Sequence, residues 1–313
     1  MVVYTTATDG FGDVAREVAD ARGEELVRDG EAAREPDGTV LWVDHPETMA
    51  DAEQEVVAFQ ERLMRRGPDA GGFTLITGYT PEDARALYFE ETEASDADVS
   101  LFTDRFEPDR LPDTPDETTL VGEELTAERV GELTEEPVRS FSMSGSGRLI
   151  HIYLSEGVIC GVPESLDVSD YDDPQPYCIT DDYEVDCPLY GELLPADEID
   201  AAHFFLLSCT HTLPNGAAGL PVYPSLGMLQ GADSMIGSYR VSASHPYETL
   251  LHHALFRAGY DLVERCYLLL RNDHSNDIMA YPYVPFGRPD AAIDGHEPTA
   301  DVTSPTLSTT DVA

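Results

Sequence analysis

The sequence contains no lysine, and its 18 basic residues are all arginine, whereas Asp and Glu number 61. The formal net charge is therefore −43. A surface that binds nucleic acid or an anionic membrane needs clustered Lys and Arg to neutralise phosphate groups. The composition argues against both classes of partner.

Long apolar runs are missing as well. No run of 18 apolar residues occurs, so the sequence predicts no helix that crosses a membrane. Residues 1–6 lack a basic region followed by an apolar stretch and do not resemble a signal peptide. No P-loop and no G-x-G-x-x-G motif follows a predicted strand, so nothing in the sequence indicates a nucleotide cofactor.

The cysteines are few and show no metal-binding spacing. None of them forms a C-x-x-C pair, so we expect neither a structural zinc site nor any other metal or cofactor. An odd number in a reducing compartment favours free thiols. The five are Cys160, Cys178, Cys187, Cys209 and Cys266.

The acidic residues are spread over nearly every segment that is not apolar. A charge of this size strains a compact fold by self-repulsion at low salt, but at 1 M salt it is screened within about 3 Å. We therefore expect the cytoplasm of a halophile. A protein that used its acids to bind basic partners or cations would need a concentrated acidic block instead.

Strand and helix patterns alternate in the first part of the chain. The sequence predicts buried strands at 2–5, 39–44 and 73–77 and helices at 14–28 and 51–66. A further helix begins with Thr80 as N-cap, Pro81 in the first turn and two acids after it. Such repeats predict an α/β fold with a mainly parallel sheet that is covered on both faces.

Three segments show little pattern. Residues 95–136 and 163–192 are acidic and rich in proline, and we interpret both as insertions over the surface, the first with a helix at 126–133. The main domain is expected to span residues 1–288. Residues 289–313 are rich in Pro, Asp, Thr and Ser and are expected to be disordered.

An apolar run leads into Cys209. Residues 204–207 read Phe-Phe-Leu-Leu, and Pro214 and Gly216 follow the cysteine. A short apolar run with such boundaries is typical of a strand buried in a parallel sheet, so Cys209 is expected at the carboxyl end of a strand, where α/β proteins place their ligands. After it come a glycine loop at 226–233, a strand at 234–239 and helices at 245–258 and 261–270.

This order of elements resembles the caspase-like cysteine peptidases of the gingipain and CHAT kind. The segments that match are Leu207-Ser208-Cys209-Thr210 and residues 231–238, and the likeness covers roughly the last third of the chain. The resemblance implies a caspase-like three-layer sandwich. It also implies that Cys209 is a catalytic nucleophile, activated by a base that lowers its thiol pKa.

The sequence departs from the family at the base. The resemblance places a His-Gly pair at the end of the neighbouring strand, but the strand predicted at 138–143 ends in Ser144 and Gly145. A serine cannot accept a thiol proton at neutral pH. His151, on a predicted hairpin, and His211, two residues beyond the cysteine, are the substitute candidates. A polar hairpin face explains His151 more simply than a relocated base does. Backbone N–H groups near Gly145 are expected to form the oxyanion pocket.

Specificity is suggested only by Arg240, which follows the strand at 234–239. It would pair with an acidic substrate side chain or with a neighbouring Asp or Glu. The hypothesis is a cysteine endopeptidase that acts on a peptide or protein. The alternatives are an inactive relative that keeps the fold as a protein-interaction module, and an unrelated α/β protein in which Cys209 only packs. The sequence predicts no oligomeric state.

Overall fold

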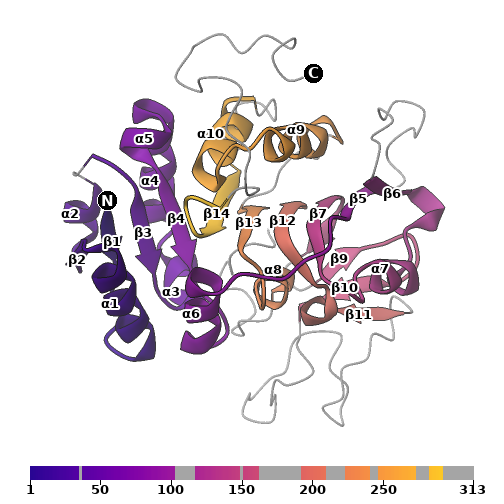
Figure 1. Cartoon of the computed structure of the whole chain (residues 1–313), viewed down its shortest axis with the longest axis horizontal. Helices are drawn as coiled ribbons and strands as arrows, with labels where there is room; N and C mark the ends of the chain where they lie inside the picture. The colour runs from indigo at the N-terminus through magenta and orange to yellow at the C-terminus, as the bar shows by residue number, and fades with distance from the viewer. Residues whose placement is uncertain are drawn as a thin grey trace.

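The computed structural model describes residues 1–34, 37–102, 117–148, 151–161, 192–208, 223–239, 246–272 and 282–291. Its centre is a sheet of ten strands in the order β2-β1-β3-β4-β14-β13-β12-β7-β5-β6 (Figure 1). Neighbouring strands of this sheet run parallel except for β13 and β14, which are antiparallel. The predicted α/β class with a mainly parallel sheet is confirmed.

The first half of the sheet is built by the first 90 residues. Its strands are β1 (Val2–Tyr4), β2 (Glu25–Val27), β3 (Val40–Val43) and β4 (Phe73–Ile76). The helices are α1 (Gly10–Arg22), α2 (Gly30–Arg34), α3 (Pro46–Asp51), α4 (Glu53–Arg66), α5 (Pro68–Gly71) and α6 (Pro81–Phe89).

Side-chain alternation along these strands explains why both faces are covered. Val3 and Leu41 point to the face that carries α1 and α6. Their neighbours Tyr4 and Trp42 point to the other face, where their rings pack against Phe59 of α4. Each strand therefore buries apolar side chains on both sides, as continuous apolar runs predict.

The second half holds the candidate site. Its strands are β5 (Asp98–Phe102), β6 (Glu117–Val121), β7 (Val138–Ser144), β12 (Ala201–Leu207), β13 (Ser234–Ser238) and β14 (Tyr283–Gly287). Around it lie η2 (Gly122–Glu124), α7 (Ala127–Leu133), η4 (Ala196–Glu198), α8 (Pro224–Met228), α9 (Pro246–Arg257) and α10 (Leu262–Asn272).

A smaller sheet lies beside the second half (Figure 1). Its order is β11-β10-β9-β8, with β8 (Gly147–Arg148), β9 (His151–Tyr153), β10 (Val158–Cys160) and β11 (Leu193–Pro195). β8 and β9 form a hairpin that continues directly from β7, and β10 pairs antiparallel with β9. The hairpin predicted around His151 is thus present.

Three interpretations of local structure were wrong. Residues 25–27 form strand β2 at the sheet edge and not the end of a helix. The segment 95–136 is no surface excursion throughout, because it contributes β5, which is buried, and β6 to the central sheet. Strand β14 was not predicted at all, although it links the two halves.

Two further expectations concern residues outside the described ranges. Nearly all of the segment 163–192 and of the tail 289–313 lies there, so these remain predictions.

Among the described residues, no helix is long and apolar enough to cross a membrane. The same part of the chain contains no group of three or more His, Cys, Asp or Glu side chains arranged to hold a metal ion.

Helix α10 is preceded by a half-buried acid, Asp261, that makes stability depend on pH. Asp261 and Glu264 each accept a hydrogen bond from the other's backbone N–H. Burial raises the pKa of Asp261 to about 6, so the folded state is destabilised as pH rises from about 4 through 6. Asp261→Asn keeps an oxygen acceptor for the cap and is expected to stabilise the fold by roughly 1–2 kcal/mol at neutral pH. Thermal unfolding of both proteins at neutral pH and below pH 4 should show the gain only at neutral pH. An equal gain at both pH values would contradict the prediction.

Candidate functional site

The carboxyl ends of β7 and β12 lie next to each other. The two strands are parallel, and Leu207 of β12 pairs with Ser144 of β7. Beyond this pair, the N–H of Gly145 donates to the carbonyl oxygen of Leu207 over 3.0 Å. Ser208 follows and is buried. Cys209 is the next residue, so the chain enters the predicted nucleophile position directly beside Gly145.

Several predicted site residues lie outside the described ranges. They are Cys209, His211 and Arg240, in the segments 209–222 and 240–245. The described residues Ser144, Gly145 and His151 show the surroundings into which the cysteine segment leads.

Ser144 is fully buried, so its side chain is not exposed to solvent at the carboxyl edge of the sheet. Phe205, two residues before the paired Leu207, stacks on His252 of α9 with ring centroids 4.5 Å apart. Because side chains two apart on a strand share a face, Leu207 and its partner Ser144 also point to the α9 side. The hydroxyl at the position where the family resemblance expects a histidine is therefore enclosed between the sheet and the layer of α9.

The N–H of Gly145 already donates a hydrogen bond to the carbonyl oxygen of Leu207. A group that stabilises a developing oxyanion must keep its N–H directed at the substrate oxygen. An oxyanion donor near Gly145 would therefore have to come from another backbone amide.

His151 lies on the hairpin that leaves β7. His151 is 3 % exposed, so its side chain does not lie on a solvent-exposed face of the hairpin. The hairpin is tied back to the end of β7, because the N–H of Tyr153 donates to the carbonyl oxygen of Ser146 over 2.9 Å. His151 pairs with Arg148 on one side and with Cys160 of β10 on the other. It is thus part of strands β8–β10, which lie between Gly145 and Gly161 in the sequence and which we call the wall.

The far side of this wall is fixed by Gly161 and Tyr79. The Tyr79 hydroxyl donates to the carbonyl oxygen of Gly161 over 2.9 Å. Burial, followed by the nearby Asp197 and Cys160, raises the pKa of Tyr79 well above its usual value, so the phenol keeps the proton that it donates. Sequence reasoning did not single out Tyr79; its only signal was its place after the predicted strand at 73–77.

Gly161 also contacts Tyr223 and Pro224, the first described residues after the cysteine segment 209–222. A Cβ at this position would lie 2.4 Å from backbone atoms of Tyr223 and Pro224, so only glycine permits the contact. Tyr223 is the first described residue after 209–222 and is buried. The described residues on the two sides of 209–222 therefore contact Gly145, through Leu207, and Gly161, through Tyr223, at the two ends of the wall that carries His151.

The other buried histidines of this half serve packing. His203 Nδ1 lies 2.8 Å from Ser234 Oγ, and His252 Nε2 lies 3.2 Å from a guanidinium nitrogen of Arg265. Burial, with Arg265 next, lowers the pKa of both rings well below the usual value and keeps them neutral. His253, next to His252 on α9, is buried as well.

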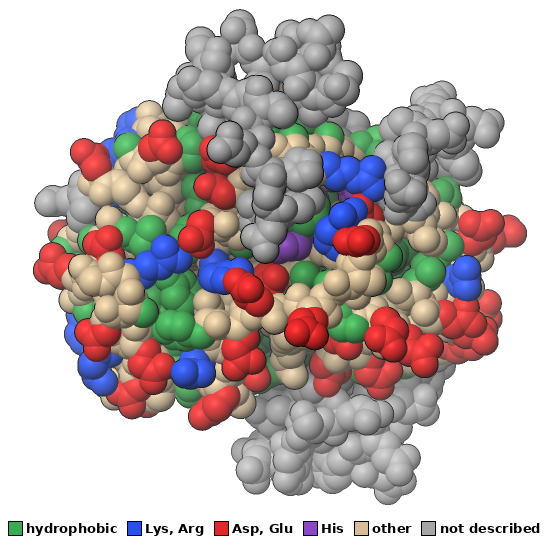
Figure 2. Space-filling model, in the orientation of Figure 1, with side chains coloured by type: hydrophobic (Ala, Val, Ile, Leu, Met, Phe, Trp, Pro, Cys, Tyr) green, Lys and Arg blue, Asp and Glu red, His purple; other side chains and the backbone are tan. Residues whose placement is uncertain are grey.

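The surface charge is distributed and not gathered at one place. Figure 2 shows acidic side chains over much of the visible face, with arginines among them. Several arginines pair with these acids, for example Arg85 with Glu17 and Arg66 with Asp37. On this face the acidic side chains are therefore spread out and not gathered into one patch.

Comparison with known proteins supports the fold and nothing finer. No known family model and no curated protein sequence matches this chain. Among solved structures, the chain is similar to the complex of Porphyromonas gingivalis RgpB pro- and mature domains. The TM-score is 0.51 at 8 % sequence identity, over 93 % of this chain and 79 % of that one. The central sheet with its helices is thus that of a caspase-like α/β fold.

Proposed function

We propose that this chain is a cysteine endopeptidase of the caspase and gingipain kind, in which Cys209 is the nucleophile and His151 the base. One observation carries the proposal most. In a gingipain-like fold, Leu207 and Tyr223, which precede and follow the segment with Cys209, contact Gly145 and Gly161, the two ends of the wall that holds His151.

The chemistry would be acyl transfer. The Cys209 thiol gives its proton to a ring nitrogen of His151, and the thiolate attacks the scissile carbonyl carbon. The resulting imidazolium then protonates the leaving amine, and water hydrolyses the thioester. His211 is the second candidate for the base because it lies two residues from the cysteine. Arg240 would bind an acidic substrate side chain.

A second function has its own supporting observation. Ser144 occupies the position of the histidine in the resembled family and is enclosed beneath α9. A chain that has lost this base while keeping the sandwich would serve as a protein-interaction module. The similar RgpB structure is itself a complex of two protein domains, which makes a protein the natural class of partner in either case.

The working environment that we propose is a cytoplasm of high salt. The net charge of −43 causes electrostatic self-repulsion in the folded chain, and molar salt screens this repulsion. Activity and stability are therefore best measured at molar KCl.

The peptidase is tested by labelling with a peptide that carries a thiol-reactive electrophile, at molar KCl and followed by intact mass. The wild type is expected to gain one label and Cys209→Ala none. His151→Ala is expected to react about 100-fold more slowly near neutral pH, because general-base assistance contributes about 10²–10⁴-fold. Its rate should recover as pH approaches the ordinary thiol pKa, about 8.5.

Matched controls separate the possible failures. Cys178→Ala removes a thiol elsewhere, and His45→Ala removes a partly exposed histidine that pairs with Asp9 in the first half. Both should label like the wild type. Labelling that survives His151→Ala unchanged would overturn the assigned base and direct attention to His211. A wild type that takes up no label would overturn the peptidase and leave the interaction module.

A further inference from the structure

Strand β6 forms one edge of the central sheet. It pairs with β5 on one side, and no described strand pairs with it on the other. Proteins protect such edges with short strands, lysine, proline or bulges, because unpaired backbone groups bind other strands. Residues Thr118, Thr119, Leu120 and Val121 contain none of these and favour strand structure.

The opposite edge of the same sheet is protected. β2 has only three residues, which limits what can pair there, whereas β6 has five. Both strands begin with a glutamate, so β6 differs from β2 in offering the longer edge.

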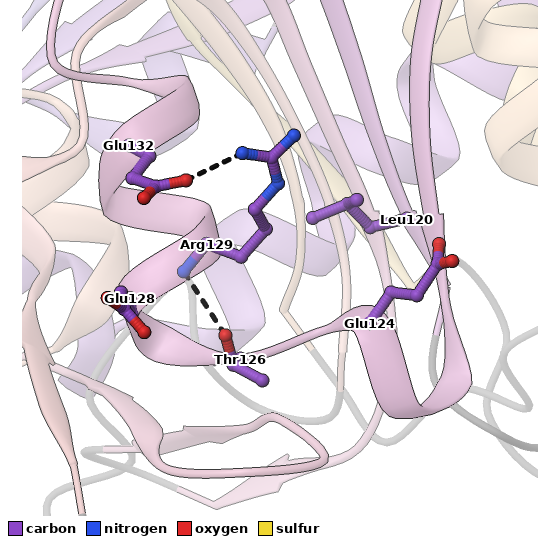
Figure 3. A pocket seen from close by; sticks show the side chains of 6 residues that line it. All are labelled: Leu120, Glu124, Thr126, Glu128, Arg129 and Glu132. Carbon is purple, nitrogen blue, oxygen red and sulfur yellow. Dashed lines mark hydrogen bonds and ion pairs between the residues drawn. The ribbon is translucent and has the colours of Figure 1, made fainter.

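A cavity of about 440 Å³ adjoins this edge. It is lined by Leu120 of β6 and by residues of η2 and α7 (Figure 3). Its floor is apolar because Leu120 belongs to the buried core. Its rim is acidic, with the exposed carboxylates of Glu124, Glu128 and Glu132.

Arg129 pairs with only one of these three acids, Glu132. Figure 3 shows its side chain reaching from α7 toward the cavity, where its guanidinium pairs with Glu132 over 2.6 Å. The backbone N–H of the same residue donates to Thr126, the N-cap of α7. Glu124 and Glu128 are left as the acids that a positively charged side chain would meet.

We propose that β6 and the adjoining cavity bind an extended, arginine-containing segment of a partner protein. The segment adds to the sheet as a further strand through its main chain, and an arginine side chain opposite Leu120 enters the cavity. Its alkyl stem packs on Leu120, and its guanidinium pairs with Glu124 and Glu128. This surface is separate from the candidate active site at β7 and β12, so the proposal does not depend on catalysis.

The test is an array of random peptides, about ten residues long, probed with the full chain at molar KCl. Binders are expected to share an Arg that lies within a run of strand-forming residues. The double variant Glu124→Arg with Glu128→Arg should bind the best peptide about tenfold more weakly or worse. A matched control reverses two exposed acids on other helices, Asp20→Arg with Glu61→Arg, and should bind as the wild type does.

Two measurements identify the mode of binding. The bound peptide should slow hydrogen exchange of amides in 118–121, and N-methylation of its backbone should abolish binding. Binders that share no Arg, an unchanged affinity in the cavity variant, or no protection at 118–121 would overturn the proposal. Concentration-dependent dimerisation through 118–121 without peptide would assign the edge to a second copy of this chain and overturn it as well.

Discussion

Replacement of Asp98 by asparagine is expected to lower the free energy of unfolding by about 3–5 kcal/mol, because it leaves partly buried positive charge without its counter-ion. Asp98 is fully buried at the start of β5. Its carboxylate binds Arg139 of β7, with a shortest distance of 2.5 Å, and Arg257 of α9 over 2.8 Å. His253 Nε2 lies 3.3 Å away. One carboxylate thus joins β5, β7 and α9.

The Asp98 carboxylate also makes the free energy of unfolding fall at acidic pH. Burial alone would raise the pKa of Asp98, but hydrogen bonds from His253, Arg139 and Arg257 outweigh it and hold this pKa far below the usual value. A depressed pKa contributes stability that is present above the unfolded value, near 3.9, and is lost as pH falls below it. Asp98→Asn should therefore unfold with a shallower pH dependence below about pH 4.

The control is Asp96→Asn, two residues earlier and exposed. Chemical denaturation at molar KCl, at neutral pH and near pH 3, compares both variants with the wild type. Asp96→Asn should change stability by less than about 0.5 kcal/mol. A similarly small change in Asp98→Asn would show that this ion cluster does not join the three elements.

Replacement of Arg62 by methionine is expected to cost about 3 kcal/mol or more, because it leaves buried carbonyl groups without donors. Arg62 lies on α4 and is 1 % exposed. Its guanidinium donates to the carbonyl oxygens of Gly72 over 3.2 Å, Ala70 over 3.3 Å and Gly38 over 2.5 Å. Gly38 lies just before β3, and Ala70 of α5 and Gly72 lie just before β4.

Arg65→Met is the matched control, since Arg65 is on the same helix and exposed. Both variants are compared by thermal unfolding at molar KCl, with circular dichroism as the signal. Arg62→Met should unfold at a clearly lower temperature, whereas Arg65→Met should stay close to the wild type. Equal melting temperatures would mean that water replaces the three hydrogen bonds at no cost.

The sequence predicted the elements that follow local rules. Thr80 and Asp83 form the reciprocal cap that the residues before α6 indicated. Apolar runs such as Val40–Val43 and Ala201–Leu207 are buried strands, because few other structures bury an uninterrupted apolar segment. The adjacency of Gly145 to the cysteine strand also followed, since consecutive parallel strands end at the same edge.

Elements whose stability comes from distant partners were not predicted. The strand Asp98–Phe102 begins with an acidic residue, which is typical of an exposed segment. Asp98 is buried only because arginines of β7 and α9 neutralise its charge. Tyr283–Gly287 contains a proline and lies in a segment of loop-like composition, yet it pairs with β13. The role of Tyr79 depends on Gly161, 82 residues away. No local pattern carries such information.

Strand β14 sets the order in which the protein can assemble during synthesis. It lies between β4, completed by residue 76, and β13, completed by residue 238, yet it is made of residues 283–287. Until the ribosome has delivered it, β4 and β13 both present unpaired edges that can bind other nascent chains. A chain that stopped before residue 283 would keep those edges, so its expected fate is aggregation or degradation and not a smaller stable protein.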